Sequence, residues 1–106
     1  MPIPNLLADT ISEKEYLASV KAVAQALNWK VYHTLRSTGS DKGFLDLVLV
    51  RGDTCLFIEL KSQKGKVSAD QQDWIDALSK VMVVKAGVAR PSDWPQLQRL
   101  LEGLRS

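Results

Sequence analysis

Asp46 and Glu59 lie at equal distances on either side of a short turn and would face each other across a β-hairpin. Residues equally far from a two-residue loop pair with each other, and Gly52-Asp53 is typical of such a loop. The two carboxylates are therefore expected at paired positions whose Cβ atoms are roughly 5 Å apart. Because like charges that face each other destabilise a sheet, this pair requires a cation nearby.

Lys61 is one candidate for that cation, because it follows Glu59 by two residues and so lies on the same face of the strand. The surrounding apolar residues indicate that both strands are buried, and burying two unpaired carboxylates costs several kcal/mol each. A divalent ion removes this cost, and oxygen ligands favour Mg²⁺ or Mn²⁺. The pattern thus predicts a metal site for phosphodiester hydrolysis. The alternative is a buried Lys61–Glu59 ion pair without chemistry.

Composition predicts one domain that spans residues 1–106, with 45% hydrophobic and 25% charged residues. No apolar run approaches the roughly 20 residues of a membrane span, and no signal peptide opens the chain, so we expect no membrane partner. The single Cys55 cannot form an intrachain disulfide, which favours a reducing, cytoplasmic setting. The net charge of +2 does not by itself indicate a nucleic-acid partner. Basic residues nevertheless gather around the acid pair, at Arg36, Lys42, Arg51, Lys61, Lys64 and Lys66.

The hydrophobic pattern predicts an α/β fold in the order helix, three strands, helix, strand, helix. Apolar residues on both faces of the hairpin strands imply a sheet that is covered on both sides. Residues 1–9 are expected to form an irregular arm. The expected helices span about 10 or 12 to 27, 68 to 79 and 95 to 104, and the expected strands span 29–34, 44–50, 54–61 and 81–85.

Three capping boxes mark helix starts. Thr10-x-x-Glu13 and Ser12-x-x-Glu15 compete for the start of the first helix, and Ser68-x-x-Gln71 opens the second. Asn28 is expected to end the first helix in the left-handed conformation.

Five motifs follow one another along residues 12–94. They are Glu13, Asn28-Trp29-x-Val31-Tyr32-His33, Gly43-x-x-Asp46, Glu59-Leu60-Lys61-Ser62 and Val67-Ser68-x-Asp70-Gln71-x-x-Trp74. This ordered set resembles the VRR-NUC branch of the PD-(D/E)XK nucleases, in the small stand-alone form found in bacteriophages. The resemblance implies a restriction-endonuclease-like α-β-β-β-α-β core with a mixed sheet flanked by helices, followed here by a C-terminal helix.

The resemblance also implies roles for the central residues. In that family the acids at the positions of Asp46 and Glu59 bind a metal, together with the backbone carbonyl that follows, here Leu60. The lysine at the position of Lys61 orients or activates the attacking water and steadies the scissile phosphate, as its charge allows. The implied cofactor is Mg²⁺, for which Mn²⁺ can substitute, with no small-molecule cofactor.

Two further residues have alternative interpretations. Gln71 matches a family glutamine near the active site, but it could instead cap its helix with Ser68. Glu13 matches an extra acid near the metal, with Glu15 as the alternative, and either could simply cap the first helix.

The sequence departs from the family pattern at Leu45, where many relatives have proline before the first acid. Proline there supplies rigidity rather than a ligand, so activity is expected to remain. His33 is interpreted as structural or as a phosphate contact. Tyr32, Trp74 and Trp94 are interpreted as core aromatics, and the expected DNA-backbone contacts are Arg36, Lys42, Lys64 and Lys66.

These features together predict a metal-dependent DNA endonuclease. A homodimer with two sites would suit branched DNA with two-fold symmetry, as in a Holliday junction resolvase of replication or repair. In a phage protein the setting would be the host cytoplasm. The alternatives are nicking, flap or exonuclease cleavage within a repair complex, or a non-catalytic nucleic-acid-binding domain of the same fold. No recognition helix is evident, which argues against sequence-specific cutting.

Overall fold

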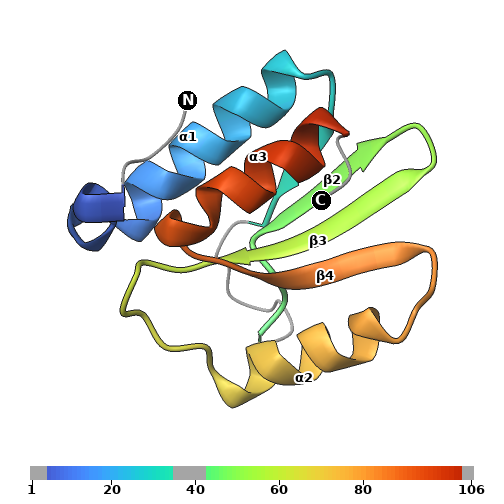
Figure 1. The fold of residues 1–106 in the computed structure, drawn as a ribbon. Coiled ribbons are helices and arrows are strands. Elements are labelled where there is room, and N and C mark those ends of the chain that lie inside the picture. The colour runs from blue at the N-terminus through green and yellow to red at the C-terminus, as the bar shows by residue number, and fades with distance from the viewer. Residues whose placement is uncertain (1–4, 35–42, 104–106) are drawn as a thin grey trace.

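A four-stranded sheet forms the centre of the molecule, and helices cover both of its faces (Figure 1). The computed structural model describes residues 5–34 and 43–103. The α/β class and the predicted order of helices and strands are confirmed, with two additional 3₁₀-helices. The elements are η1 (Asn5–Thr10), α1 (Glu13–Ala26), β1 (Lys30–His33), β2 (Leu47–Arg51), β3 (Thr54–Leu60), α2 (Ala69–Ser79), β4 (Val84–Ala89), η2 (Pro91–Asp93) and α3 (Trp94–Glu102).

The sheet is mixed and has the strand order β1-β2-β3-β4. The first three strands are antiparallel neighbours, whereas β4 runs parallel to β3. A parallel neighbour requires a crossover connection, and α2 provides it on the face opposite α1 and α3 (Figure 1). This arrangement agrees with the restriction-endonuclease-like core that the sequence predicted.

The predicted hairpin register is confirmed. Pairing between β2 and β3 runs from Arg51 with Thr54 at the turn to Leu47 with Ile58. Gly52 has a φ of +60° in this turn, a conformation that glycine adopts without strain. β2 begins later than expected, so Asp46 lies just before the strand, beside the position of Glu59 in β3.

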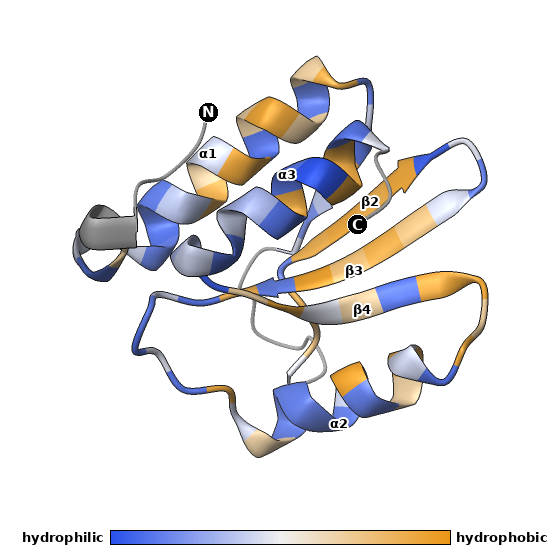
Figure 2. Ribbon diagram, viewed as in Figure 1, coloured by the Kyte–Doolittle hydropathy of each residue, from blue (hydrophilic) through white to orange (hydrophobic). Residues whose placement is uncertain are grey.

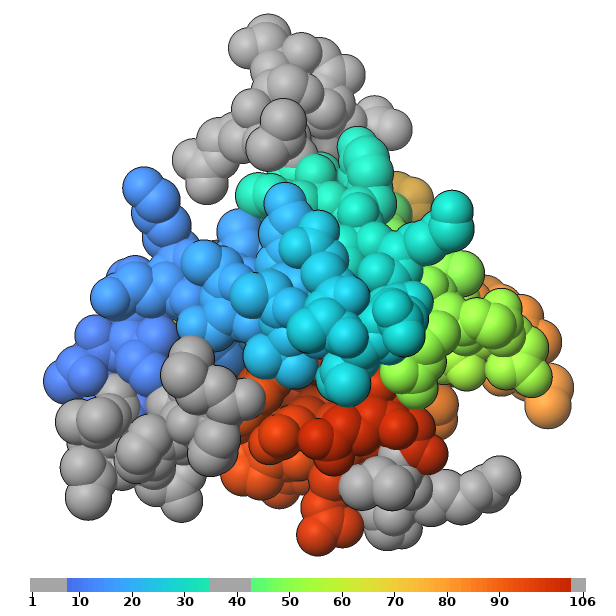
Figure 3. Space-filling view, turned by 90° about the horizontal axis from the view of Figure 1, so that it is seen from above, coloured from blue at the N-terminus to red at the C-terminus, as the bar shows by residue number. Residues whose placement is uncertain are grey.

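The main core lies between the sheet and the pair α1 and α3, which lie side by side (Figure 3). Apolar residues run along β2 and β3, as Figure 2 shows. The alternation of β2 buries Leu47 and Leu49 while leaving Val50 exposed. Trp29, which follows α1, is linked to α3, because its Nε1 donates to the carbonyl of Leu101 at 2.9 Å. The buried core residues are Tyr16, Val20, Ala24, Trp29, Leu47, Leu49, Leu56, Ile58, Leu60, Ala89, Trp94, Leu97 and Leu101.

The start of α1 is set by the second of the two competing capping boxes. The Glu15 amide donates to Ser12 Oγ at 3.1 Å, and the Ser12 amide donates to Glu15 Oε1 at 3.0 Å. Thr10 instead ends η1, and Ser12 is the N-cap of α1. Asn28 ends the helix with a φ of 70°, as predicted. Glu15 is therefore used as a cap, and the side chain of Glu13 is left for another role.

Residues 1–9 were expected to be irregular, and for the described part this prediction is wrong. Residues 5–10 form η1, in which Ala8 is buried. η1 packs against η2, a contact between distant parts of the chain that a local sequence pattern cannot reveal.

The fourth strand was predicted at residues 81–85, and this prediction is also wrong. β4 begins at Val84, which pairs with Cys55 near the start of β3, so the preceding residues have no strand opposite them. Val81, Met82 and Val83 lie exposed in the turn after α2. The apolar residues 81–83 therefore resemble a strand in sequence, but in the structure they lie outside the sheet.

Two smaller predictions also require correction. Tyr32 is 61% exposed rather than part of the core, because β1 is an edge strand and α2 packs against β4 at the opposite edge. The last helix begins at Trp94, directly after η2, and ends at Gly103 with a φ of 83°. Within residues 5–34 and 43–103, no helix is long and apolar enough to span a membrane.

Candidate metal centre and active site

Three carboxylates from different elements converge at one end of the sheet. Glu13 is the first residue of α1, Asp46 precedes β2, and Glu59 lies near the end of β3. One carboxylate oxygen from each lies within 4.8 Å of the other two. Glu13 is exposed, Asp46 is partly buried and Glu59 is only 1% exposed. The cluster is therefore anchored in the sheet and open to solvent on the side of α1.

Lys61 supplies positive charge to this cluster, as the strand periodicity predicted. Its Nζ lies 3.3 Å from Glu59 Oε2 and 3.8 Å from Glu13 Oε1. The Lys61 side chain is 14% exposed, so the ammonium is mostly enclosed. Its backbone amide donates to the Ala89 carbonyl at 3.2 Å, which fixes the residue beside the end of β4.

Asp46 is oriented by the backbone of β3. The Leu60 amide donates to Asp46 Oδ2 at 3.0 Å, and the Asp46 carbonyl accepts from the Thr34 amide at 2.8 Å. These bonds hold the aspartate at the open end of the hairpin. The first of these bonds uses the Leu60 amide, whereas the binding of a metal by the Leu60 carbonyl stays a prediction.

Gln71 caps α2 and also contacts Glu59, so its two possible positions are compatible with each other. Its backbone amide donates to Ser68 Oγ at 3.1 Å, and its Oε1 accepts from the Ser68 amide at 3.0 Å. The other end of the same side chain, Nε2, donates to Glu59 Oε2 at 2.8 Å. The capping box of α2 thus aims the amide nitrogen of Gln71 at the buried carboxylate.

The environment of Glu59 raises its pKa from 4.5 to about 7. Burial is the main cause, and the charge of Asp46 adds to it, while Lys61 acts in the opposite direction. Both Gln71 and Lys61 contact Oε2, whereas the buried Oε1 has no hydrogen-bond partner among the described residues. A buried carboxylate with one oxygen unpartnered, beside two other carboxylates, fits a hard divalent cation.

The segment before Asp46 is held against α2. Gly43 has a φ of +81°, and a Cβ at this position would lie 2.5 Å from the Asp70 Cβ atom. The ring of Phe44 packs edge-on against Trp74 and Phe57, at centroid distances of 5.0 and 6.1 Å. The contact between Phe44 and Trp74 therefore ties the segment to α2, while the contact with Phe57 ties it to β3.

The VRR-NUC domain family matches residues 4–92, from the start of the chain through α1, the sheet and η2. This chain belongs to the VRR-NUC family. VRR-NUC domains are PD-(D/E)XK nucleases, so the resemblance and the mixed-sheet fold predicted from the sequence are confirmed. A search of curated proteins and a search of solved structures each give no match.

Leu45 occupies the position in this VRR-NUC domain where proline was noted as common. Its side chain is fully buried, so packing constrains the residue that directly precedes Asp46. His33 ends β1, is partly buried and pairs with Leu47, outside the acidic cluster. Trp94 is buried as predicted, whereas Trp74 is only partly buried.

Two of the four predicted DNA-backbone contacts lie in the described part of the VRR-NUC domain. Lys64 and Lys66 are exposed on the loop that follows Lys61. Arg36 and Lys42 lie outside the described residues. The sequence did not single out Arg90, which binds this same loop through three carbonyls. Its place directly after β4 gave no signal, because the strand was expected to end earlier.

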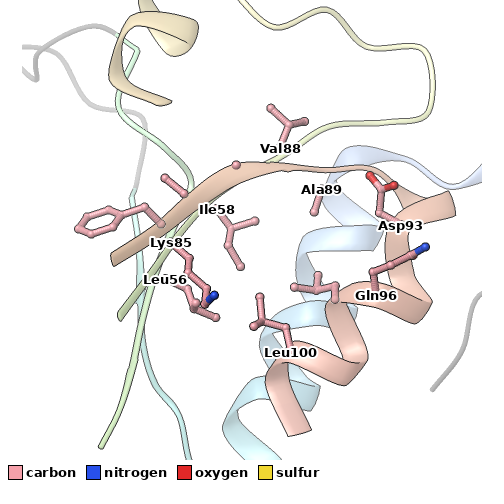
Figure 4. A pocket seen from close by; sticks show the side chains of 12 residues that line it. Leu56, Ile58, Lys85, Val88, Ala89, Asp93, Gln96 and Leu100 are labelled. Atoms are coloured by element: carbon pink, nitrogen blue, oxygen red, sulfur yellow. The ribbon is translucent and has the colours of Figure 1, made fainter. Parts of the chain in front are cut away.

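A pocket of about 320 Å³ lies between β4 and α3, away from the acidic cluster (Figure 4). Its wall is mainly apolar and includes Leu56, Ile58, Leu97 and Leu100, with Asp93 and Gln96 at one side. None of the clustered acids lines it. The pocket and the acidic cluster are therefore separate features of this domain.

Proposed function

We propose that this VRR-NUC domain is a metal-dependent DNA endonuclease that hydrolyses phosphodiester bonds at the cluster of Glu13, Asp46 and Glu59. The observation that carries the proposal is the convergence of three carboxylate oxygens within 4.8 Å, with Lys61 against two of the three acids. Structural acids rarely gather in this way, because their mutual repulsion and burial are unfavourable without a cation.

In this proposal Asp46, Glu59 and Glu13 hold Mg²⁺, for which Mn²⁺ can substitute, and the Leu60 carbonyl is a further ligand. When bound, the ion supplies a Lewis acid for the phosphate and lowers the pKa of the attacking water. Glu59 is fixed for this task by Gln71 Nε2, and Asp46 is fixed by the Leu60 amide.

Lys61 places a positive charge at the mouth of the cluster. Its ammonium bridges Glu59 and Glu13 when no substrate is present. We propose that a phosphate replaces the longer contact, with Glu13 at 3.8 Å, so that Lys61 steadies the scissile phosphate and orients the attacking water. Glu13 would then be available as a ligand of the metal.

The proposed substrate is DNA with a branch, such as a four-way junction. A chain of 106 residues has little surface with which to surround DNA, and a homodimer would bring two sites to a two-fold substrate. Lys64 and Lys66 are proposed to contact the DNA backbone, with Arg36 and Lys42 outside the described residues. The proposed setting is the cytoplasm, of the host cell if the protein comes from a phage.

The test is cleavage of a labelled four-way junction and a matched linear duplex with Mg²⁺, Mn²⁺ or EDTA. We expect symmetric nicks on the junction that require the metal. Asp46→Ala and Lys61→Ala should each abolish cleavage, whereas Asp73→Ala, at an exposed acid of α2, should not change it. Cleavage that persists in Asp46→Ala would exclude this site, and no cleavage with either metal would exclude the enzyme.

A further inference from the structure

A single guanidinium binds three carbonyls of the loop between Lys61 and α2. Arg90 Nη1 donates to the carbonyls of Ser62, Gln63 and Gly65 at 2.9, 3.3 and 2.8 Å. Because Nη1 carries only two hydrogens, the longest bond shares a hydrogen with a neighbour. Three backbone acceptors of one short turn thus converge on one nitrogen.

The turn itself is tight. The Gly65 amide donates to the Ser62 carbonyl at 3.1 Å, and Lys64 lies exposed between them. A Cβ at Gly65 would lie 2.9 Å from Ser62 Oγ, so this position requires glycine or a shift of the serine side chain. A second pair of bonds joins the turn to η2, since Gln63 Nε2 donates to Ser92 Oγ and the Ser92 amide donates to Gln63 Oε1.

Arg90 is itself fixed from two sides. Its amide donates to Asp93 Oδ2 at 2.9 Å, and its carbonyl accepts from the buried Tyr16 hydroxyl at 2.8 Å. Among residues 5–34 and 43–103, the guanidinium makes no ion pair. The turn is therefore bound to this cation through its backbone carbonyl groups.

Both ends of this loop belong to the acidic site. It begins after Lys61, which pairs with Glu59, and it ends at Ser68, the cap that aims Gln71 at Glu59. Lys64 and Lys66 are the exposed cations between these ends. DNA that places a phosphate at Lys61 must therefore pass close to a loop whose backbone is already ordered.

We infer that Arg90 is a positioning residue for DNA binding, which holds the turn Ser62–Gly65 so that Lys64 and Lys66 are presented to backbone phosphates next to the scissile one. This inference rests on the proposed function. A loop that is ordered before binding loses less conformational entropy when DNA arrives, so the same lysines bind more tightly. Arg90 acts through the loop and is not a catalytic residue.

The first test measures DNA binding in EDTA, where cleavage does not occur, over a series of salt concentrations. Arg90→Met should raise the Kd about 10-fold, because the loop and its two lysines must then be ordered when DNA binds. Arg90→Lys should recover part of the affinity, because the three N–H donors of an ammonium can bind some of the same carbonyls. Arg99→Met, the same change at an exposed arginine of α3, should leave the Kd unchanged.

The second test separates positioning from general destabilisation. Lys64→Met should weaken binding and reduce the salt slope by about 1 in the wild type, as expected for one phosphate contact. In the Arg90→Met background the same change should have less than half this effect, because the lysine is no longer held in place. Independent, additive effects of the two substitutions would overturn the inference.

Hydrogen exchange supplies a readout that does not depend on DNA. The Gly65 amide should exchange at least 10-fold faster in Arg90→Met, with amides of β2 and β3 unchanged, and Arg90→Lys should lie between. An unchanged exchange rate of the Gly65 amide in both variants would refute the proposal that Arg90 holds the turn. Faster exchange in a protein whose wild type binds no DNA would refute the phosphate role and, separately, the proposed function.

Discussion

Both donors to the Glu59 carboxylate, Gln71 and Lys61, contact the same oxygen. The other oxygen is buried without a partner among the described residues. Such an arrangement is unfavourable for an ionised carboxylate, and burial accordingly raises its pKa to about 7. The residue is therefore better suited to a state in which a cation shares the site than to the metal-free state.

A pH dependence of the metal-free protein follows from this shift. Because the folded-state pKa of about 7 lies above the ordinary glutamate value of 4.5, the folded state binds more protons between these pH values. The free energy of unfolding in EDTA should therefore fall as the pH rises from about 4.5 to about 7. Urea denaturation across this range would measure it, and Glu59→Gln should remove this part of the dependence. If the free energy of unfolding of the wild type had the same pH dependence as that of Glu59→Gln, the raised pKa of Glu59 would be contradicted.

The double role of Gln71 predicts a double effect of its removal. Gln71→Ala should lower the free energy of unfolding by about 1 kcal/mol, as expected for a lost capping interaction. It should also weaken Mn²⁺ binding measured by calorimetry, because Glu59 loses its donor at 2.8 Å.

Gln72→Ala is the matched control at the neighbouring residue. Gln72 is exposed and donates to Asp76 on the solvent side of α2, so its loss should not alter Mn²⁺ binding. Equal loss of metal affinity in the two variants would contradict the proposed role of Gln71.

At the scale of elements, the site depends on how closely α2 approaches the segment before β2. Gly43 touches Asp70 at the start of α2, and Phe44 packs against Trp74 one helical turn later. Since Asp46 follows Gly43 by three residues and Gln71 follows Asp70 directly, this packing sets the position of an acid and of the donor to another acid.

Gly43→Ala should therefore be more harmful than the same change at another glycine with positive φ. Gly52 has a φ of +60° and open space around its Cβ position, so Gly52→Ala should cost only the conformational penalty of about 1 kcal/mol. Gly43→Ala adds a clash with Asp70 at 2.5 Å, and it should be less stable than Gly52→Ala and lose metal affinity. Equal free energies of unfolding for the two variants in chemical denaturation would show that Asp70 moves aside without an energetic penalty.

The sequence predicted those elements whose evidence is local. The hairpin register follows from one turn, and the start of α2 follows from the spacing of Ser68 and Gln71. β4 was misplaced because its position is set by parallel pairing with β3 across the whole of α2, while the local signal was the apolar run at Val81.

The convergence of residues at the candidate site could be predicted from the sequence only where these residues lie on one local element. Asp46, Glu59 and Lys61 lie on one hairpin, so periodicity alone placed them together. Glu13 was favoured over Glu15 by its spacing to Trp29, although both fit a capping box. In the structure Glu15 forms the box with Ser12, and Glu13 lies in the acidic cluster. The contacts of Arg90 join the end of β4 to a loop 25 to 28 residues earlier, which no spacing rule indicates.

At the scale of the whole molecule, the acids collect where two helices begin. Glu13 is the first residue of α1, and Gln71 lies in the first turn of α2, on the opposite face of the sheet (Figure 1). Helix N-termini carry partial positive charge, so this arrangement offsets part of the repulsion among the carboxylates. The helices on the two faces of the sheet therefore each place a partly positive N-terminus near the acids.

The proposed homodimer can be tested with mixed assemblies. If each protomer cuts one strand, a dimer of one wild-type and one Asp46→Ala protomer should nick a four-way junction once without resolving it. Separating the mixed dimer by a tag and following both labelled strands would measure this. Full resolution by a dimer with a single intact site, or a monomeric mass for the active species in sedimentation, would contradict a two-site mechanism.

The Gly52-Asp53 turn lies at the far end of the hairpin from the acids. With about 3.3 Å per strand residue, the six residues from Asp53 to Glu59 span roughly 20 Å. The turn is exposed, and apart from the adjoining residues no atom of the described residues would lie within 4 Å of a Cβ at Gly52. A dye, an affinity tag or a carrier protein inserted there would be held at a known distance from the acids. The turn is therefore suited to immobilising the nuclease or to measuring DNA binding and release.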